Sequence, residues 1–338
     1  MITVAVDAMG GDLAPNATVQ GAVDAIRETG GDLKVMLVGK QDAIEQELAS
    51  IGTTSNIEIR HAGEVIGMEE SASAMVKTKK ESSIVKGLEF HREGETDAFL
   101  SAGNTGAVMA ASTLLLGRVK GVQRPTIGTF LPHVSGVTLL IDAGANVNSK
   151  PSHLMQFGVM GSIYFQLVTG NAAPRVGLVS VGEEEGKGDE LTKEAHALLK
   201  TAPVNFIGNI EGRDLLRGTV DVAVCDGFVG NTVLKFAESV PSLLKAKFRQ
   251  EADKSFFRKL WIGMISGTLR NVMKDWDYQE HGGVPLLGVN GVSIIGHGSS
   301  TPLAIKNMIL RAKEMAERNI NARIAESLGS LEQGEERS

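Results

Sequence analysis

The chain has 338 residues, enough for one large domain with a substantial core, and its 42% hydrophobic and 22% charged residues are typical of a globular protein. A formal net charge of −6 argues against a general affinity for nucleic acid. The single cysteine, Cys225, excludes an internal disulfide and fits a reducing compartment. No signal peptide is evident, and no run of about 18 uncharged apolar residues could span a bilayer. We therefore expect a cytoplasmic protein, at most associated with the inner face of the cell membrane.

Apolar, strand-like runs alternate with helical periodicity along most of the chain. Strands are predicted at residues 3–7, 33–38, 57–65, 98–101, 126–131, 137–143, 176–181, 204–207, 220–225 and 288–295. Helices are predicted at residues 16–29, 42–51, 105–116, 154–168, 190–199, 232–249 and 302–328. This alternation predicts an α/β fold with a doubly wound, mostly parallel sheet and helices on both faces. We expect a single catalytic domain at 1–330, a protruding helical segment at 254–277 and a flexible tail at 331–338.

Glycine is unusually frequent, with 40 residues that fall singly or in pairs just after the predicted strands. A tight strand-to-helix turn needs a positive φ or close approach of the backbone to a ligand, which glycine permits. The polar residues and the glycines that we single out in these turns are Asp7, Gly10, Gly11, Asp12, Ser101, Gly103, Asn104, Thr105, Asp142, Asn146, Asp226, Gly227, Asn231 and His297. Because ligands of open parallel sheets bind at the carboxyl ends of the strands, we expect these turns to share one sheet edge.

Several of these turns open a predicted helix, and that placement indicates an anion site. Free backbone N–H groups and the positive end of the helix dipole attract phosphate, and small side chains let it approach. The alternative is that Asn, Asp, Ser and Thr at these positions only cap helices. The repetition of the pattern favours a site that handles phosphate.

Three residues outside these helix starts need to be considered for a catalytic role. Lys187 lies between glycines after a run of glutamates and could bring a cation to phosphate, although a solvated charged loop is equally consistent. His297 lies between glycines at a strand end and could act as a general acid or base, bind phosphate, or simply form the turn. Cys225 lies inside an apolar run and is expected to be buried, not nucleophilic.

The sequence lacks several well-known signatures. It has no G-x-G-x-x-G dinucleotide fingerprint, no G-x-x-x-x-G-K-[ST] loop, no G-x-S-x-G elbow and no Cys/His cluster suited to zinc. We therefore expect no metal site.

Along most of its length the sequence resembles the phosphate acyltransferases called PlsX. The motifs that carry this resemblance are VAVDAMGGDLAP, SAGNTGA, IDAGANVNSKPSHLMQFGVMG, VGEEEGKG, IGNIEGRD, VAVCDGFVGNTVLK and HGSS. The resemblance implies a fold like that of the isocitrate and isopropylmalate dehydrogenases, a homodimer and no organic cofactor. It also implies transfer of a fatty acyl group from acyl carrier protein to inorganic phosphate. The acyl phosphate then serves a membrane acyltransferase that acylates glycerol 3-phosphate in phospholipid synthesis.

For this reaction we expect phosphate to attack the thioester directly, without a covalent acyl-enzyme. The expected phosphate ligands are Ser101, Gly103, Asn104, Thr105 and Gly227. Lys187, His297, Asp226 and Asn231 are the expected catalytic residues, of which Lys187 or His297 would offset charge or protonate the leaving thiolate. Asp7, Asp12 and Asp142 would orient loops, bind Lys187 or accept a proton. Alternatives are an acyl-coenzyme A phosphotransacetylase, an NAD-dependent dehydrogenase on a related fold, and a non-catalytic membrane scaffold.

Residues 254–277 form a basic, amphipathic pattern with aromatic residues. Apolar side chains recur there at helical spacing, and Gly267 is expected to divide the segment into two short helices. Such a helix can lie in a membrane interface, or it can form a dimer contact, a core hairpin or a docking surface for the acidic carrier protein. The candidate contact residues are Phe257, Leu260, Trp261, Met264 and Ile265.

Overall fold

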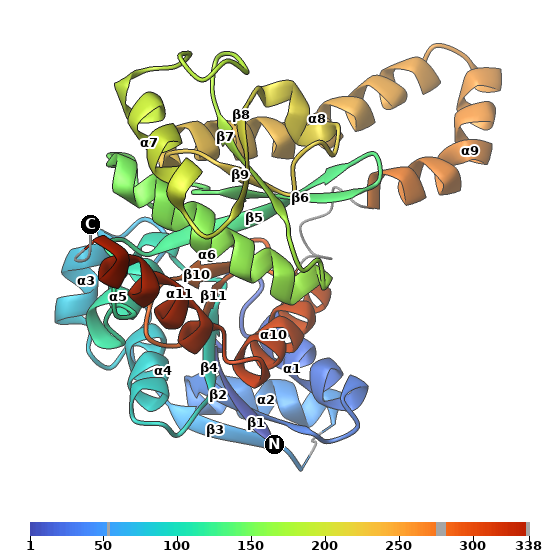
Figure 1. The fold of residues 1–338 in the computed structure, drawn as a ribbon. Coiled ribbons are helices and arrows are strands. Elements are labelled where there is room, and N and C mark those ends of the chain that lie inside the picture. The colour runs from blue at the N-terminus through green and yellow to red at the C-terminus, as the bar shows by residue number, and fades with distance from the viewer. Residues whose placement is uncertain (53–54, 275–281, 336–338) are drawn as a thin grey trace.

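The computed structural model describes residues 1–52, 55–274 and 282–335. Within these ranges, eleven strands form one mixed sheet with helices on both faces (Figure 1), which confirms an α/β arrangement. The strands are β1 Ile2–Asp7, β2 Leu33–Gly39, β3 Ile57–His61, β4 Ala98–Ser101, β5 Thr126–His133, β6 Gly136–Ile141, β7 Arg175–Val179, β8 Asn205–Ile210, β9 Val222–Val224, β10 Val284–Leu287 and β11 Ser293–Ile295. The helices are α1 Asn16–Glu28, α2 Gln41–Ile51, α3 Ala72–Thr78, α4 Ser83–Arg92, α5 Thr105–Leu115, α6 Pro151–Thr169, α7 Glu190–Thr201, α8 Gly227–Ala252, α9 Phe256–Lys274, α10 Pro302–Glu317 and α11 Ile320–Glu335, with a 3₁₀ turn at Gly212–Leu216.

The sheet consists of two parallel blocks joined by antiparallel strands. Its order is β3-β2-β1-β4-β11-β10-β5-β6-β9-β7-β8. Strands β3, β2, β1, β4 and β11 are mutually parallel, as are β6, β9, β7 and β8. The pairs β11–β10, β10–β5 and β5–β6 are antiparallel, so the two parallel blocks run in opposite directions. The expectation that all the polar turns share one sheet edge is therefore wrong.

Alternation of side chains along the strands explains why helices cover both faces. In β1, Val4 and Val6 belong to the core beneath α1 and α10, whereas Ala5 belongs to the core beneath α4 and α5. In β6, Leu139 packs on the side of α6, and Leu140 packs on the side of the first turns of α8. Inner strands of both parallel blocks are thus buried on both faces, whereas the edge strands β3 and β8 are partly exposed.

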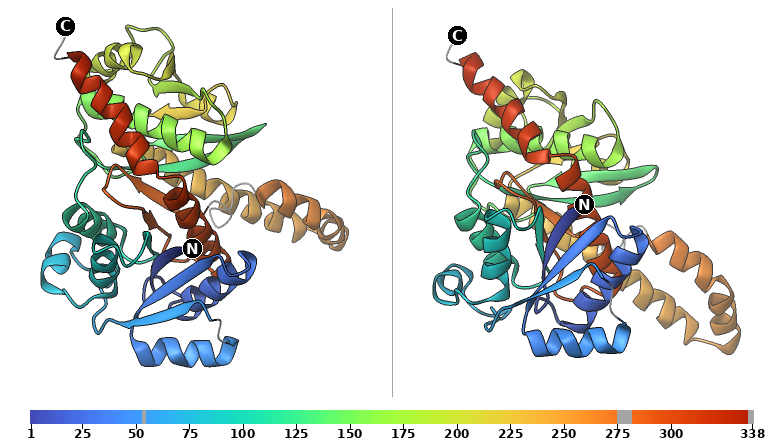
Figure 2. Two further views of the ribbon diagram at one scale, coloured as in Figure 1. Left: turned by 60° about the horizontal axis from the view of Figure 1, so that its bottom comes forward. Right: turned by 90° about the horizontal axis from the view of Figure 1, so that it is seen from below.

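The C-terminal helix is divided in two, contrary to the single helix predicted at 302–328. Asn319 adopts φ 49° between α10 and α11, and asparagine tolerates this left-handed conformation better than most residues. The break lets α10 pack against α1 and the first block while α11 packs against α6 in the second (Figure 2). Helix α11 ends at Glu335, so it includes residues 331–335 of the segment predicted as a flexible tail. Residues 336–338 lie outside the described ranges.

Helices α8 and α9 form a hairpin that projects from the body of the molecule (Figure 1). Helix α9 lies within the segment 254–277. Helix α9 runs without interruption through Gly267, so the division into two short helices is wrong. A single glycine costs a helix only about 1 kcal/mol relative to alanine and need not end it. Residues 275–277 of the predicted segment lie outside the described ranges.

Several elements were missed or misplaced by periodicity. The strand predicted at 288–295 corresponds to the short strand β11 alone, and its antiparallel neighbour β10, just before the predicted range, was missed. Helices α3 and α4 were not predicted because their segment lacks a long apolar stripe. These elements matter for the site, because β10 lines it and the loop before α3 closes one side.

Candidate active site

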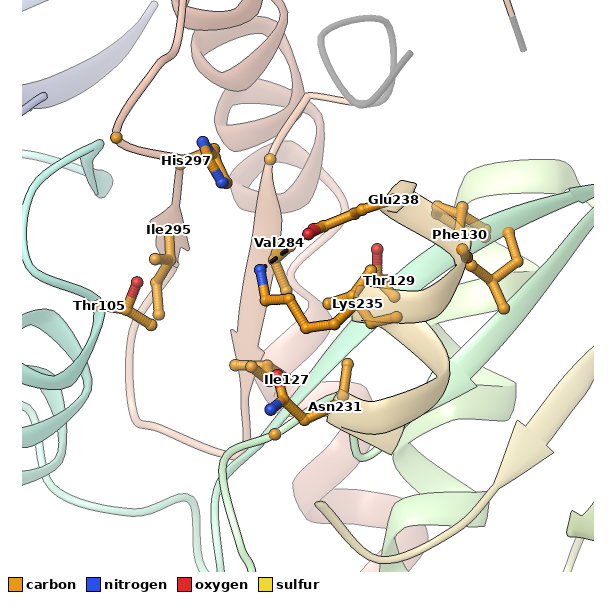
Figure 3. Close-up of a pocket in the computed structure, with 18 of the residues that line it drawn as sticks. Thr105, Ile127, Thr129, Phe130, Asn231, Lys235, Glu238, Val284, Ile295 and His297 are labelled. Atoms are coloured by element: carbon orange, nitrogen blue, oxygen red, sulfur yellow. Dashed lines mark hydrogen bonds and ion pairs between the residues drawn. The ribbon is translucent and has the colours of Figure 1, made fainter. Parts of the chain in front are cut away.

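A cavity of about 430 Å³ lies between the two blocks of the sheet (Figure 3). Turns from both blocks reach it despite their opposite strand directions. From the first block come Asp12, Thr105 and His297, and from the second come Gly144 and Asn231. The middle strands β5 and β10 form the floor between them. The structure thus brings together residues from each of the polar turns predicted from the sequence.

The start of α5 contributes backbone donors more than side chains. Asn104 accepts a hydrogen bond from Ala107 N–H at 3.0 Å and so caps the helix. Its amide group donates to the carbonyls of Gly67, Met68 and Glu70 at 3.0–3.2 Å, which fixes the loop before α3. The Asn104 side chain is therefore committed to the scaffold, and Thr105, the next residue, is the one that lines the cavity.

The Ser101 side chain is also part of the scaffold. It is fully buried, donates to Asp7 Oδ2 at 2.6 Å and accepts from Gly103 N–H at 2.9 Å. Gly10 packs so closely on this group that a Cβ there would lie 2.5 Å from Asp7 Oδ2. Burial raises the pKa of Asp7, and the hydrogen bond from Ser101 partly offsets that rise. These residues hold the β1 and β4 turns together behind the cavity wall.

A second scaffold cluster supports the start of α8. Asp142 is buried and accepts hydrogen bonds from Ala145 N–H at 2.9 Å and from Asn146 N–H at 2.7 Å, so its carboxylate folds the loop after β6. Burial raises the pKa of Asp142, and these hydrogen bonds lower it in part. Gly227 donates to the Asn146 carbonyl at 2.9 Å.

The backbone at the start of α8 packs directly against the backbone of that loop, with no side chain between them. Asp226 caps the helix, accepting from Phe228 and Val229 N–H groups at 2.7 and 2.9 Å. A Cβ on Gly230 would lie 1.8 Å from the Asp142 carbonyl oxygen. Neither Asp226 nor Gly227 lines the cavity; Asn231, one turn along, does.

His297 and Asp12 lie at the opposite wall. The His297 ring lines the cavity, and its Nδ1 lies 2.8 Å from the Ser299 hydroxyl and 3.3 Å from the Ser299 nitrogen, which donates to it. Acceptance of that N–H at Nδ1 puts the ring proton of the neutral imidazole on Nε2. Asp12 N–H donates to the Gly298 carbonyl at 2.7 Å, so a hydrogen bond joins the Gly11–Asp12 turn to the His297 turn.

Lys187 does not line the cavity. It is exposed in the loop between β7 and α7, where its side chain lies against Gly182. Neighbouring glutamates of that loop pair with Arg213 and Lys200. The geometry therefore gives Lys187 no contact with the other predicted site residues.

Sequence reasoning missed the remaining polar residues of the cavity and its apolar wall. Lys235 and Glu238 line the cavity from α8, and Lys235 Nζ lies 2.8 Å from Glu238 Oε2. Their spacing of four and seven residues from Asn231 places them on the same helix face, a signal that could have found them. The apolar wall consists of Met68, Ile127, Phe130, Leu131, Leu234, Val284 and Ile295.

Cys225 is buried, as predicted, with 3% exposure. Burial raises the pKa of its thiol well above the ordinary value, and the nearby Asp142 carboxylate adds to the rise. Such a thiol is a poor nucleophile at neutral pH. Among the described residues, no group of three or more His, Cys, Asp or Glu side chains is arranged to hold a metal ion.

Comparison with known proteins identifies the family. A family model described as fatty acid synthesis protein matches residues 2–323. The phosphate acyltransferase of Pelotomaculum thermopropionicum is 49% identical over 329 residues, covering 97% of this chain and 96% of the relative. That of Chlorobaculum parvum is 46% identical over 338 residues, covering 97% and 99%. The chain belongs to the phosphate acyltransferase family.

Solved structures with a similar fold are much less similar in sequence to this chain than these phosphate acyltransferases are. The EutD phosphotransacetylase from Staphylococcus aureus has a TM-score of 0.59 at 13% identity, covering 93% of this chain and 94% of that one. A 4-hydroxythreonine-4-phosphate dehydrogenase from Klebsiella pneumoniae has a TM-score of 0.54 at 12% identity, covering 94% and 99%. At such identities the likeness concerns the fold alone.

Proposed function

We propose that this member of the phosphate acyltransferase family transfers a long-chain fatty acyl group from the thioester of acyl carrier protein to inorganic phosphate. The observation that carries the proposal is that one cavity is lined both by polar side chains, among them Thr105, Asn231 and His297, and by apolar side chains from β5, α8 and β10. Polar groups suit phosphate, and apolar side chains suit an acyl chain.

In the proposed reaction, phosphate lies at the start of α5. The N–H groups of Thr105 and Gly106 have no acceptor among the described residues, as is usual in the first turn of a helix, and the helix dipole favours an anion there. Glycine and threonine at these positions leave room for the ligand. Fixing phosphate beside the thioester is the main task, because orientation alone can contribute about 7–11 kcal/mol to lowering a barrier.

The chemical step is direct attack. A phosphate oxygen forms a bond to the thioester carbonyl carbon, the carbon–sulfur bond breaks, and the sulfur leaves as a thiolate. The proton of hydrogen phosphate then passes to that thiolate, and His297 on the cavity wall is the group we assign to relay it. The buried thiol of Cys225, with its raised pKa, takes no part in this direct attack.

The α8–α9 hairpin supports a further part of the proposal, contact with the membrane surface. Phe257 and Leu260 on α9 are 80% and 55% exposed, and Trp261 and Met264 beside them are exposed as well. Amphipathic helices with exposed aromatic and basic residues lie in membrane interfaces. No helix in the described ranges has both the length and the apolar character needed to cross a bilayer. We propose that the hairpin brings a homodimer to the membrane, where an acyltransferase uses the acyl phosphate.

Trapping with hydroxylamine tests the proposed function. The purified protein is incubated with phosphate and either palmitoyl carrier protein or palmitoyl coenzyme A, and acyl phosphate is measured as the hydroxamate. We expect product from the carrier-protein thioester. Product only from the coenzyme A thioester would favour a phosphotransacetylase, and absence of product from both would refute acyl transfer to phosphate. The Cys225→Ala variant is expected to keep its activity.

A further inference from the structure

The cavity contains a charged pair that the proposed chemistry leaves unused. Lys235 and Glu238 project from the face of α8 that also carries Asn231, and Figure 3 shows their ion pair among the residues that line the cavity. The Lys235 ammonium lies 2.8 Å from Glu238 Oε2. Among the described lining residues, Lys235 is the one with a fixed positive charge.

The pair is weakly held. The side chains of Lys235 and Glu238 are 56% and 34% exposed, and exposed ion pairs contribute little to folding stability. Lysine carries its charge on a flexible four-carbon stem, so its ammonium can change partner by rotation of the side chain alone. The α8 backbone need not move, because its start is fixed on the Asp142 loop.

The charges that line the cavity explain why Lys235 would exchange Glu238 for phosphate. Asp12 and Glu238 are both acidic and both line the cavity, so a phosphate dianion meets two carboxylates there. An uncompensated dianion beside them would be repelled. Phosphate therefore needs the Lys235 charge, and in this structure that charge is paired with Glu238.

We propose, resting on the proposed function, that Lys235 binds the attacking phosphate and that Glu238 competes with phosphate for the lysine. When phosphate binds, the ammonium moves from the carboxylate to the phosphate oxygens. The two members of the pair then have opposite effects: Lys235 raises the affinity for phosphate, and Glu238 lowers it. A pair that served only the surface of α8 would give neither effect.

The test measures binding of inorganic phosphate by ³¹P NMR titration and the phosphate KM in acyl phosphate formation, at constant ionic strength. We expect Lys235→Gln to weaken binding and raise KM by about tenfold or more, because a hydrogen bond to a charged group is lost. Glu238→Gln should tighten binding by about threefold, because a competing negative charge is removed. Lys235→Arg should bind within about threefold of the wild type, because the charge is retained.

Lys245→Gln is the matched control, since it removes the same charge from an exposed position of α8 that does not line the cavity. It should leave phosphate binding unchanged. Unchanged binding in Lys235→Gln, or a shift of the same sign in Lys235→Gln and Glu238→Gln, would overturn the inference, as would a wild type that binds no phosphate. Failure of the proposed function is seen separately, as a wild type that binds phosphate but forms no acyl phosphate.

Discussion

The Ser101 hydroxyl donates a 2.6 Å hydrogen bond to the Asp7 carboxylate across 94 residues of sequence. Both side chains are buried, so the bond joins the turn after β1 to the turn after β4 inside the protein. Ser101 was expected to bind phosphate and Asp7 to orient a loop, and both side chains are buried outside the set of residues that line the cavity. Their contribution is to hold the Gly11–Asp12 turn and the start of α5 in a fixed relation.

The raised pKa of Asp7 predicts a pH effect on stability. Because burial raises this pKa above its ordinary value of 3.8, the folded state holds the proton more tightly than the unfolded state. The stabilisation is complete below the unfolded pKa and is lost as pH rises through the folded pKa. The Asp7→Asn variant lacks this contribution to stability, so its melting temperature should improve relative to the wild type as pH rises above 3.8, the ordinary pKa of the carboxyl group. If the melting temperature of Asp7→Asn instead fell relative to the wild type as pH rose, the pKa of Asp7 would be lowered in the folded state.

Replacement of Asn104 should affect stability more than it affects phosphate contact. Asn104→Ala removes the α5 cap and the hydrogen bonds to the loop at Gly67–Glu70, which together should cost about 2 kcal/mol in urea unfolding. Asn104→Ser can still cap the helix and should recover about 1 kcal/mol. If Asn104→Ala melts like the wild type yet raises the phosphate KM tenfold, the side chain binds phosphate directly and the scaffold role is wrong.

Gly230 should tolerate no larger side chain. A Cβ at this position would lie 1.8 Å from the Asp142 carbonyl oxygen, so Gly230→Ala forces α8 away from its seat. We expect a loss of about 3 kcal/mol or more in the free energy of unfolding. The control is Gly263→Ala in α9, where nothing lies within 4 Å of an added Cβ and where alanine should stabilise the helix by about 0.5–1 kcal/mol. Similar stabilities for the two variants would contradict the close packing.

Substitutions on α9 test whether the α8–α9 hairpin contacts the membrane or a second subunit. Leu260→Glu and Met264→Glu place charges on exposed apolar positions of α9 and should reduce flotation with anionic lipid vesicles by about tenfold without loss of the fold. Val134→Glu, an equally large change at a residue that is 91% exposed in the β5–β6 turn, should float normally. Unchanged flotation together with loss of a dimer in sedimentation would assign the hairpin to the subunit interface instead.

Prediction from the sequence was strongest where structure depends on local chemistry. Apolar runs and glycine turns located strands such as β1, β4 and β6, and Asp226 and Asn104 were recognisable as possible helix caps. Prediction was weaker where packing between residues far apart in the chain determines the structure. The break at Asn319 follows from the need of α10 and α11 to cover different blocks of the sheet, which no local pattern records.

The sequence by itself determined the family, the α/β class and the glycine-opened helix starts, because these depend on residue identity, periodicity and backbone freedom within a few neighbouring residues. Tertiary structure alone decided the opposed directions of the two parallel blocks and the choice of which polar side chains face the cavity. Strand pairing and burial join residues far apart in the chain. For that reason Ser101 and Asp142 became buried supports, while Lys235 and Glu238, one and two turns beyond Asn231, reached the site.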